Sequence, residues 1–301
     1  MKLKDCNTDI TVIGLGDMGS ALADSLLNHG YSVTVWNRNV DKTLPYPKKG
    51  AQIAQSIEKA LTASPASILC LLDHSATMSV LESDTVSQSL ENRTLIQLTT
   101  MTSAESHELG DWLSSNRAQY IDGQIMSYPD DIKSGCASIV CSGDRDTFDG
   151  YKELLEAMAG KVLYVGEDIG SAPAFDKAHL AWAIGSYQVF LQGAAMCQLT
   201  GVDLRMWCDY SLQHLESGAA TKELSILADQ ICTRNYDEGL DATMGVWKNA
   251  IDKVIEEFNM AGIKKSHLEN LSELSNSAIE SGMEGKELGV LFEQILSGVK
   301  S

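Results

Sequence analysis

Short apolar runs alternate with helical patterns over the first half of the chain. The runs that suit single strands lie at residues 9–14, 31–36, 67–72, 94–99, 119–123, 137–143 and 161–166. Between several of them apolar residues recur at helical spacing, at residues 17–30, 103–116 and 145–160. Strands that alternate with helices build a mainly parallel sheet with helices on both faces. The pattern therefore predicts a doubly wound α/β domain.

The pattern changes after Gly166. One long apolar stretch runs from Pro173 to about Leu199, with the proline in its first turn. Further helical patterns follow without a convincing strand, at residues 204–217, 219–235, 245–262 and 266–282. We therefore expect an α/β domain over residues 1–168 and an all-helical domain over residues 169–301, with an interdomain helix at residues 173–200.

The predicted interdomain helix is too long and apolar to be covered by so small a helical domain. Apolar surface of this extent is commonly buried against another protein surface. A second copy of the same chain would supply that surface. The sequence therefore predicts a homodimer.

Composition narrows the class of protein. The chain has 301 residues, of which 44% are hydrophobic, and a formal net charge of −18. This acidity argues against a broad nucleic-acid-binding surface. No apolar run is long enough to span a membrane, and the N-terminal stretch MKLKDCNTD lacks a hydrophobic signal segment. We expect a cytoplasmic protein without nucleic-acid or membrane partners.

The cysteines give no sign of a metal site or a disulfide framework. All seven are scattered, and no two form a CxxC pair. Several lie inside apolar runs and suit small core positions. We therefore predict no metal site.

A glycine-rich stretch, VIGLGDMGS, connects the first apolar run to the first helical pattern. In a GxGxxG motif the first glycine permits a tight turn, the second lets the backbone approach a pyrophosphate, and the third lets helix and strand pack closely. Backbone N–H groups and the positive helix end then hold the anion. The alternative is a glycine-rich turn without a ligand. The motif predicts a Rossmann-type dinucleotide site at Gly14, Leu15, Gly16, Asp17, Met18 and Gly19.

The second apolar run ends in VWNRN, where NAD-binding chains commonly place an acidic residue on the ribose. This chain has Asn37 and Arg38 there, and Lys42 follows one helical turn on. A guanidinium can pair with a 2′-phosphate and stack on adenine, whereas a carboxylate would repel the phosphate. The residues predict NADP(H) as the cofactor. The alternative is an exposed Arg38 paired with Asp41.

Three further residues complete the predicted cofactor site. They lie at or just after the ends of the third and fourth apolar runs, at the carboxyl edge of the sheet where such ligands bind. They are Leu72, Asp73 and Thr100.

Four stretches in this order, GLGDMGSALA, VWNR, YIDGQIMSYP and GSAPAFDKAHLAWAIGSYQVF, resemble the imine reductases and reductive aminases, which are relatives of the β-hydroxyacid dehydrogenases. The resemblance covers nearly the whole length and is strongest to about Gly201. It implies an N-terminal Rossmann domain, a long interdomain helix and a helical C-terminal domain. It also implies a reciprocal homodimer whose active site lies between the nucleotide domain of one subunit and the helices of the other.

The resemblance assigns the chemistry to Asp176. β-Hydroxyacid dehydrogenases carry a general acid/base lysine at this helix position and an asparagine four residues on, where this chain has Leu180. Imine reductases often carry Asp or Tyr there, assigned to substrate protonation or amine anchoring. From the residues alone, Asp176 also suits a first-turn helix residue that interacts with the dipole. Lys177 is adjacent, but neighbouring helix residues point about 100° apart, so we expect its side chain to face elsewhere.

The sequence also departs from both relatives. The Ser-Gly-Gly substrate loop of the dehydrogenases is replaced by QIMSYP, and Thr100 and Ile184 stand where reductive aminases carry Asn and Tyr. Other residues are candidates for a substrate pocket, and core packing is the alternative for the helical ones. The pocket candidates are Met126, Ser127, His179, Tyr187, Trp207 and Tyr210.

Together these observations predict an NADPH-dependent imine reductase that reduces a cyclic or prochiral C=N bond, or a carbonyl together with an amine. A first alternative is a β-hydroxyacid-dehydrogenase-like enzyme acting on carbonyls or alcohols. A second is a non-catalytic NADPH-binding or scaffold protein that has kept the fold.

Overall fold

The structure is a computed structural model that describes residues 6–240 and 242–298. It forms two compact units that divide between Ala183 and Ile184, and each is described by itself. The division falls inside one long helix, α8 (Ser171–Thr200), so the first turns of this helix belong to the first unit.

The first unit is built on an eight-stranded sheet with the strand order β3-β2-β1-β4-β5-β6-β7-β8. Neighbouring strands are parallel except β6 and β7, which are antiparallel. The predicted mainly parallel sheet is confirmed. The strands are β1 Ile10–Ile13, β2 Val33–Trp36, β3 Gln52–Ile53, β4 Ala66–Leu69, β5 Thr94–Gln97, β6 Gln119–Ile125, β7 Ser138–Gly143 and β8 Lys161–Tyr164.

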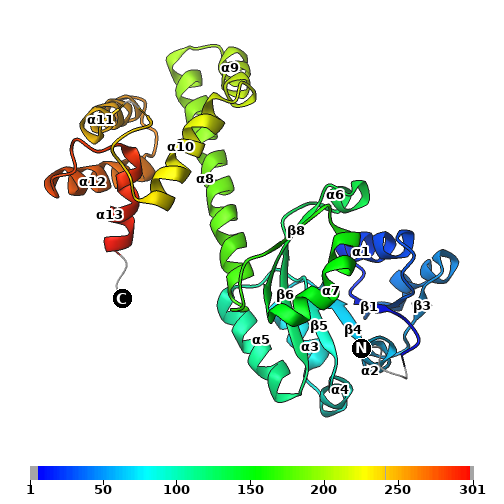
Figure 1. Cartoon of the computed structure of the whole chain (residues 1–301). Helices are drawn as coiled ribbons and strands as arrows, with labels where there is room; N and C mark the ends of the chain where they lie inside the picture. Colours follow the sequence, from blue (N-terminus) through cyan, green and yellow to red (C-terminus); the bar gives the residue numbers. More distant parts are fainter. Residues whose placement is uncertain (1–5, 241, 299–301) are drawn as a thin grey trace. The chain divides into compact units, whose positions relative to one another are not determined.

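Helices cover both faces of this sheet (Figure 1). Successive strand residues point to opposite faces, so Val12 packs in one core with Leu22 and Leu155, while Ile13 packs in the other with Leu109. Both faces of the central strands are thus buried, which explains why β1, β2 and β4 are near-continuous apolar runs. The helices are α1 Asp17–Asn28, α2 Ile57–Ala63, α3 His74–Leu81, α4 Asp84–Ser89, α5 Ser103–Ser115, α6 Pro129–Ser134 and α7 Arg145–Met158, with 3₁₀ turns η1 Val40–Thr43 and η2 Tyr46–Lys49.

The second unit is helical, which confirms the predicted change of architecture. A small core joins η3 (Leu288–Val290) and the start of α13 (Leu291–Ser297) to α11 (Met244–Met260) and α12 (Ser266–Glu280), with Met244, Ala278 and Val290 among its buried members. Its elements after α8 are α9 Leu204–Glu216, α10 Ala219–Thr233, α11 Met244–Met260, α12 Ser266–Glu280, η3 Leu288–Val290 and α13 Leu291–Ser297.

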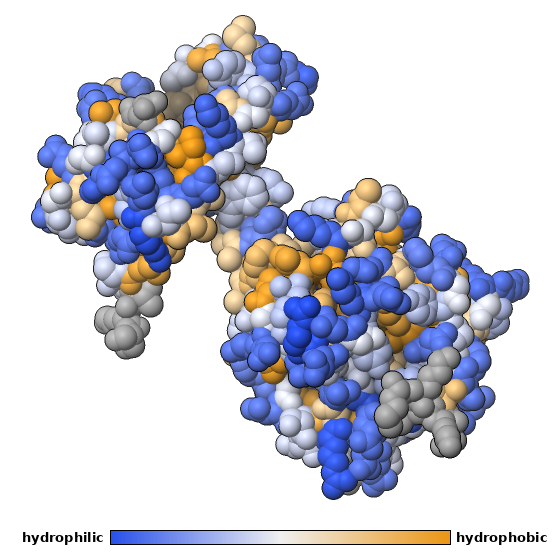
Figure 2. Space-filling model, in the orientation of Figure 1, coloured by the Kyte–Doolittle hydropathy of each residue, from blue (hydrophilic) through white to orange (hydrophobic). Residues whose placement is uncertain are grey.

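Apolar side chains are exposed along α8 and α9. The thirty residues of α8 include only three buried ones, Ala172, Pro173 and Asp176, and α9 has none. Apolar patches are visible on the surface of the helical unit (Figure 2). Within the described part of the chain, no helix has the length and apolarity needed to cross a membrane.

Candidate cofactor cleft and active site

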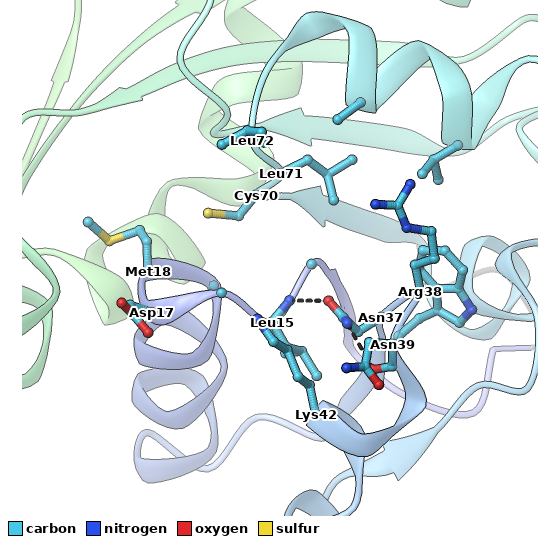
Figure 3. Close-up of a pocket in the computed structure, with 16 residues that line it drawn as sticks. Leu15, Asp17, Met18, Asn37, Arg38, Asn39, Lys42, Cys70, Leu71 and Leu72 are labelled. Atoms are coloured by element: carbon cyan, nitrogen blue, oxygen red, sulfur yellow. Dashed lines mark hydrogen bonds between the residues drawn. The ribbon is translucent and has the colours of Figure 1, made fainter.

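A cleft of about 500 Å³ opens at the carboxyl ends of β1, β2 and β4 (Figure 3). We call it the cofactor cleft. Open α/β sheets bind their ligands at this edge, just beyond the strand ends. All the predicted cofactor residues except Asp73 and Thr100 line it. The lining residues are Gly14, Leu15, Gly16, Asp17, Met18, Gly19, Trp36, Asn37, Arg38, Asn39, Lys42, Cys70, Leu71, Leu72, Ala76 and Val80.

The three motif glycines have different structural requirements. Gly14 has a φ of +99°, and a Cβ there would lie 2.2 Å from the Cys70 carbonyl oxygen. A Cβ on Gly19 would lie 2.0 Å from the Gly14 carbonyl oxygen. By contrast, a Cβ on Gly16 would meet nothing within 4 Å. The fold therefore needs glycine at positions 14 and 19, whereas Gly16 leaves open space at the cleft.

The N-terminus of α1 is suited to an anion. Gly16 is its N-cap residue and makes no side-chain cap hydrogen bond, so the N–H groups of the first turn receive no acceptor from the capping position. These N–H groups and the helix dipole favour negative charge. The turn therefore fits the pyrophosphate of a dinucleotide.

Two cations follow β2 at the other end of the cleft. Arg38 and Lys42 are both exposed, and Figure 3 shows the Arg38 guanidinium turned into the cleft. Neither forms an ion pair with any residue that the structure describes, and Arg38 is not paired with Asp41. Both charges are therefore available to a phosphate group.

Six lining residues were not singled out from the sequence. Trp36, Cys70 and Leu71 come at strand ends, where the strand pattern could have suggested them, whereas Ala76 and Val80 come from α3 and carry no local signal. Burial raises the pKa of the Cys70 thiol to about 12, so this thiol is neutral at physiological pH. The sixth residue is Asn39.

Asp73 and Thr100 lie outside the lining of the cofactor cleft. Asp73 is the N-cap of α3, and its carboxylate accepts a hydrogen bond from the backbone N–H of Ala76 at 2.7 Å. Thr100 is exposed after β5, while the hydroxyl of its buried neighbour Thr99 accepts a hydrogen bond from the Leu71 N–H at 2.9 Å. The hydroxyl that reaches the β4 end thus belongs to Thr99.

Asp176 is buried near the start of α8, with only 6% of the residue exposed. Polar contacts fix this end of the helix to the sheet domain. The Ser142 hydroxyl donates to the Ile169 carbonyl at 2.9 Å and accepts from the Ala172 N–H at 3.1 Å. The Ser103 hydroxyl donates to the Gly170 carbonyl at 2.8 Å. The carboxyl group is therefore held on a rigid element.

The expectation for Lys177 was wrong. Its ammonium Nζ donates a hydrogen bond to Oδ2 of Asp176 at 2.6 Å. The Cα–Cβ bonds of neighbouring helix residues diverge, but the four-carbon stem of lysine is long and flexible enough to turn back. The buried carboxylate thus has a cationic partner, which compensates part of the cost of burying its charge.

A second buried carboxyl group, Asp122 on β6, was missed. It is fully buried and accepts hydrogen bonds from the Tyr120 hydroxyl at 2.6 Å and the Gln124 amide at 2.8 Å. Burial raises its pKa to about 6, although these hydrogen bonds and the Lys177 charge act in the opposite direction. Its position in YIDGQIM, inside an apolar strand, was the available signal.

The predicted substrate residues of the first unit are at two places. Met126 and Ser127 follow β6, where the Met126 N–H donates to the Ser138 carbonyl at 2.9 Å and the Ser127 hydroxyl accepts from the Ser138 N–H at 3.0 Å. His179 is exposed on α8, with its ring centroid 5.6 Å from that of Trp182.

The predicted substrate residues of the second unit differ in their packing. Tyr187 and Tyr210 are exposed, at 66% and 70%. Trp207 packs against Phe190, with ring centroids 4.8 Å apart, and a Cβ on Gly193 would lie 2.6 Å from its ring. Trp207 therefore has a packing role between α8 and α9.

The described residues contain no group of three or more His, Cys, Asp or Glu side chains able to hold a metal ion. The cysteines are free thiols.

Two family models match the chain in succession. Residues 9–166 match the NAD-binding domain of 6-phosphogluconate dehydrogenase. Residues 168–297 match the C-terminal domain of the NADPH-dependent reductive aminase-like proteins.

Proteins of known activity or structure resemble the whole chain. An NADPH-dependent reductive aminase of Aspergillus oryzae is 31% identical over 96% of this chain and 97% of its own. An imine reductase from Myxococcus stipitatus in complex with NADP⁺ superposes with a TM-score of 0.85 and 26% identity, over 95% of this chain and 99% of that one. A reductive aminase from Aspergillus terreus, in complex with NADPH4, cyclohexanone and allyl amine, superposes with a TM-score of 0.79 and 29% identity. The match covers 96% of this chain and 99% of that one. The chain belongs to the imine reductase and reductive aminase family of NAD(P)-dependent oxidoreductases.

Proposed function

We propose that this chain is an NADPH-dependent imine reductase, which transfers a hydride to a cyclic or prochiral C=N bond and yields an amine. The observation that carries the proposal is the buried carboxylate of Asp176 at the start of α8. It stands at the helix position where the related dehydrogenases carry their lysine. A carboxylate suits a cationic nitrogen better than a neutral alcohol.

The cofactor cleft fits a dinucleotide with a 2′-phosphate. The first-turn N–H groups of α1 would hold the pyrophosphate, and Arg38 and Lys42 would pair with the 2′-phosphate. NADPH, when bound, supplies the hydride. The protein's own task is then to position the substrate and place charge beside it.

Asp176 would perform that electrostatic task. A C=N bond accepts hydride when its nitrogen is protonated, and a nearby carboxylate favours this cationic form. Lys177 would keep the carboxylate in place through its hydrogen bond to Oδ2. We assign Asp176 to anchoring the iminium or handling its proton. The cyclohexanone and allyl amine bound to the Aspergillus terreus relative support a ketone and an amine as precursors.

A homodimer would complete the site. The exposed apolar residues of α8 and α9 offer a surface for a second copy, whose helices would then contribute to the substrate pocket.

The decisive experiment compares Asp176→Asn with Asp146→Asn, a matched change at an exposed carboxyl on α7. NADPH oxidation is followed with 1-pyrroline as a cyclic imine, and NADPH affinity is measured separately. We expect Asp176→Asn to lose at least about 100-fold in kcat with NADPH affinity retained, and Asp146→Asn to match the wild type. Full turnover by Asp176→Asn would contradict the assignment, and equal or better use of NADH would contradict the cofactor preference.

A carbonyl or alcohol oxidoreductase is the second candidate, and one observation favours it. The Lys177 ammonium lies at the Asp176 carboxylate, where it could donate a proton to a carbonyl oxygen. A glyoxylate/succinic semialdehyde reductase of Arabidopsis thaliana is 23% identical over 72% of this chain. Reduction of glyoxylate or succinic semialdehyde, with cyclic imines inert, would establish this candidate in place of the first.

A further inference from the structure

Asn37 lies between the two phosphate-binding parts of the cofactor cleft, yet both ends of its amide are bound by the protein itself. Oδ1 accepts a hydrogen bond from the Leu15 N–H at 2.9 Å, and Nδ2 donates one to the Asn39 carbonyl at 2.9 Å (Figure 3). A backbone N–H can only donate and a carbonyl can only accept, so these partners fix the orientation of the amide.

These two bonds belong to a longer chain of contacts. Asn39 is the N-cap of η1, where its side-chain oxygen accepts from the Asp41 N–H at 3.0 Å. The η1 turn carries Lys42, and Arg38 lies between the two asparagines. The hydrogen bonds therefore run from the glycine motif, through Asn37 and Asn39, to the loop that carries the cations.

The Leu15 N–H is thereby removed from the donors open to a pyrophosphate. The N–H groups in the first turn of α1 differ from it, because Gly16, the N-cap residue, provides no side-chain acceptor for them. The first turn of α1 is therefore free to bind the anion, and the Leu15 N–H serves as a donor within the protein.

We propose that Asn37 is a positioning residue, which joins the glycine turn to the loop of Arg38 and Lys42 and so sets affinity for both nicotinamide dinucleotides. Arg38 and Lys42 distinguish the two cofactors by charge, and Asn37 fixes the position of the glycine turn relative to the loop. The inference depends on nucleotide binding by the cleft and is independent of the reaction catalysed.

The proposal is tested on the full-length protein with Asn37→Ala, Asn37→Asp and Arg38→Ala, and with Asn28→Ala as a matched control at the exposed end of α1. Affinities for NADPH and NADH are measured by nucleotide fluorescence. Hydrogen exchange of the Leu15 amide is followed without nucleotide, because a residue that only contacts ribose would not protect it.

Asn37→Ala is expected to speed Leu15 amide exchange about tenfold and to weaken NADPH and NADH by the same factor, roughly five- to tenfold. Arg38→Ala is expected to weaken NADPH alone, and Asn28→Ala to change neither measurement. Unchanged Leu15 exchange in Asn37→Ala would overturn the proposal, as would a loss confined to NADPH.

Asn37→Asp provides a second test if the alanine variant is unstable. Its carboxylate still accepts from the Leu15 N–H but cannot donate to the Asn39 carbonyl. We expect Leu15 protection to be retained and affinity to fall for both cofactors, most for NADPH because of the added negative charge. A gain in NADH affinity would mean that residue 37 binds ribose directly, which would overturn the proposal.

Discussion

Asp122 is a buried carboxyl group whose ionisation lowers the free energy of unfolding. Its carboxyl is fully buried on β6 and its pKa is raised to about 6 from an ordinary value of 3.8, mainly by burial. Because the folded pKa exceeds the unfolded one, the folded state binds more protons between these values. The contribution of Asp122 to stability is therefore greatest below pH 4, falls as the pH rises towards 6, and stays at the lower level above it.

Asp122→Asn should remove this pH dependence, because the amide is neutral at every pH and can still accept from Gln124. Relative to the wild type, we expect the free energy of unfolding of the variant to rise by up to roughly 3 kcal/mol between pH 4 and pH 7. Urea unfolding at a series of pH values measures it, with Asp111→Asn at an exposed position of α5 as the control. Parallel profiles for Asp122→Asn and the wild type would contradict the argument.

Sequence motifs identify residues that the structure brings into one cleft where the signal is local; their binding of a cofactor stays a prediction. Gly14, Gly16, Gly19 and Arg38 stand in contiguous motifs, and all line the cofactor cleft. Prediction from the sequence failed for Lys177, because helix geometry fixes the Cβ direction and leaves the end of a long side chain free.

At the level of elements, the β1–α1 turn separates structural from ligand-facing glycines. Gly19→Ala should destabilise the protein by several kcal/mol, because its Cβ would come 2.0 Å from the Gly14 carbonyl oxygen. Gly16→Ala should fold with near wild-type stability, since its Cβ meets no protein atom within 4 Å, but should weaken NADPH by about tenfold or more.

Thermal unfolding and NADPH titration of both glycine variants provide the measurement. The space around the two glycines differs within the same turn, so each variant controls for the other. A stable Gly19→Ala protein, or a Gly16→Ala protein with full NADPH affinity, would show that the two roles are wrongly assigned.

Elements were predictable where burial makes the pattern simple. Strands buried on both faces are apolar runs, so the six strands β1, β2 and β4 to β7 were anticipated. β8 was anticipated too, from the apolar run at residues 161–166, although none of its residues is buried. β3 has two residues, both exposed, and leaves no such run. The cleft lining from α3, Ala76 and Val80, could not be anticipated either, because tertiary packing alone brings α3 to the ends of β1 and β2.

For the whole molecule, the exposed apolar helices predict self-association. Leu191 and Leu199 on α8 are 66% and 62% exposed, and α9 contains no buried residue. Burying such side chains against a second copy would gain about 25 cal/mol for each Å² of apolar surface. We therefore expect a dimer of twice the 32.6 kDa chain mass in sedimentation experiments.

Leu191→Glu combined with Leu199→Glu should shift that dimer toward monomer, because two carboxylates would be buried in the interface without partners. Ser115→Glu, at the exposed end of α5, is the control and should leave the mass unchanged. If the helices of a second copy complete the substrate pocket, the monomeric variant should still bind NADPH through the cofactor cleft but lose imine turnover. A monomeric wild-type protein with full turnover would remove the dimer from the mechanism, while the roles of Asp176 and the cofactor cleft would remain open to their own tests.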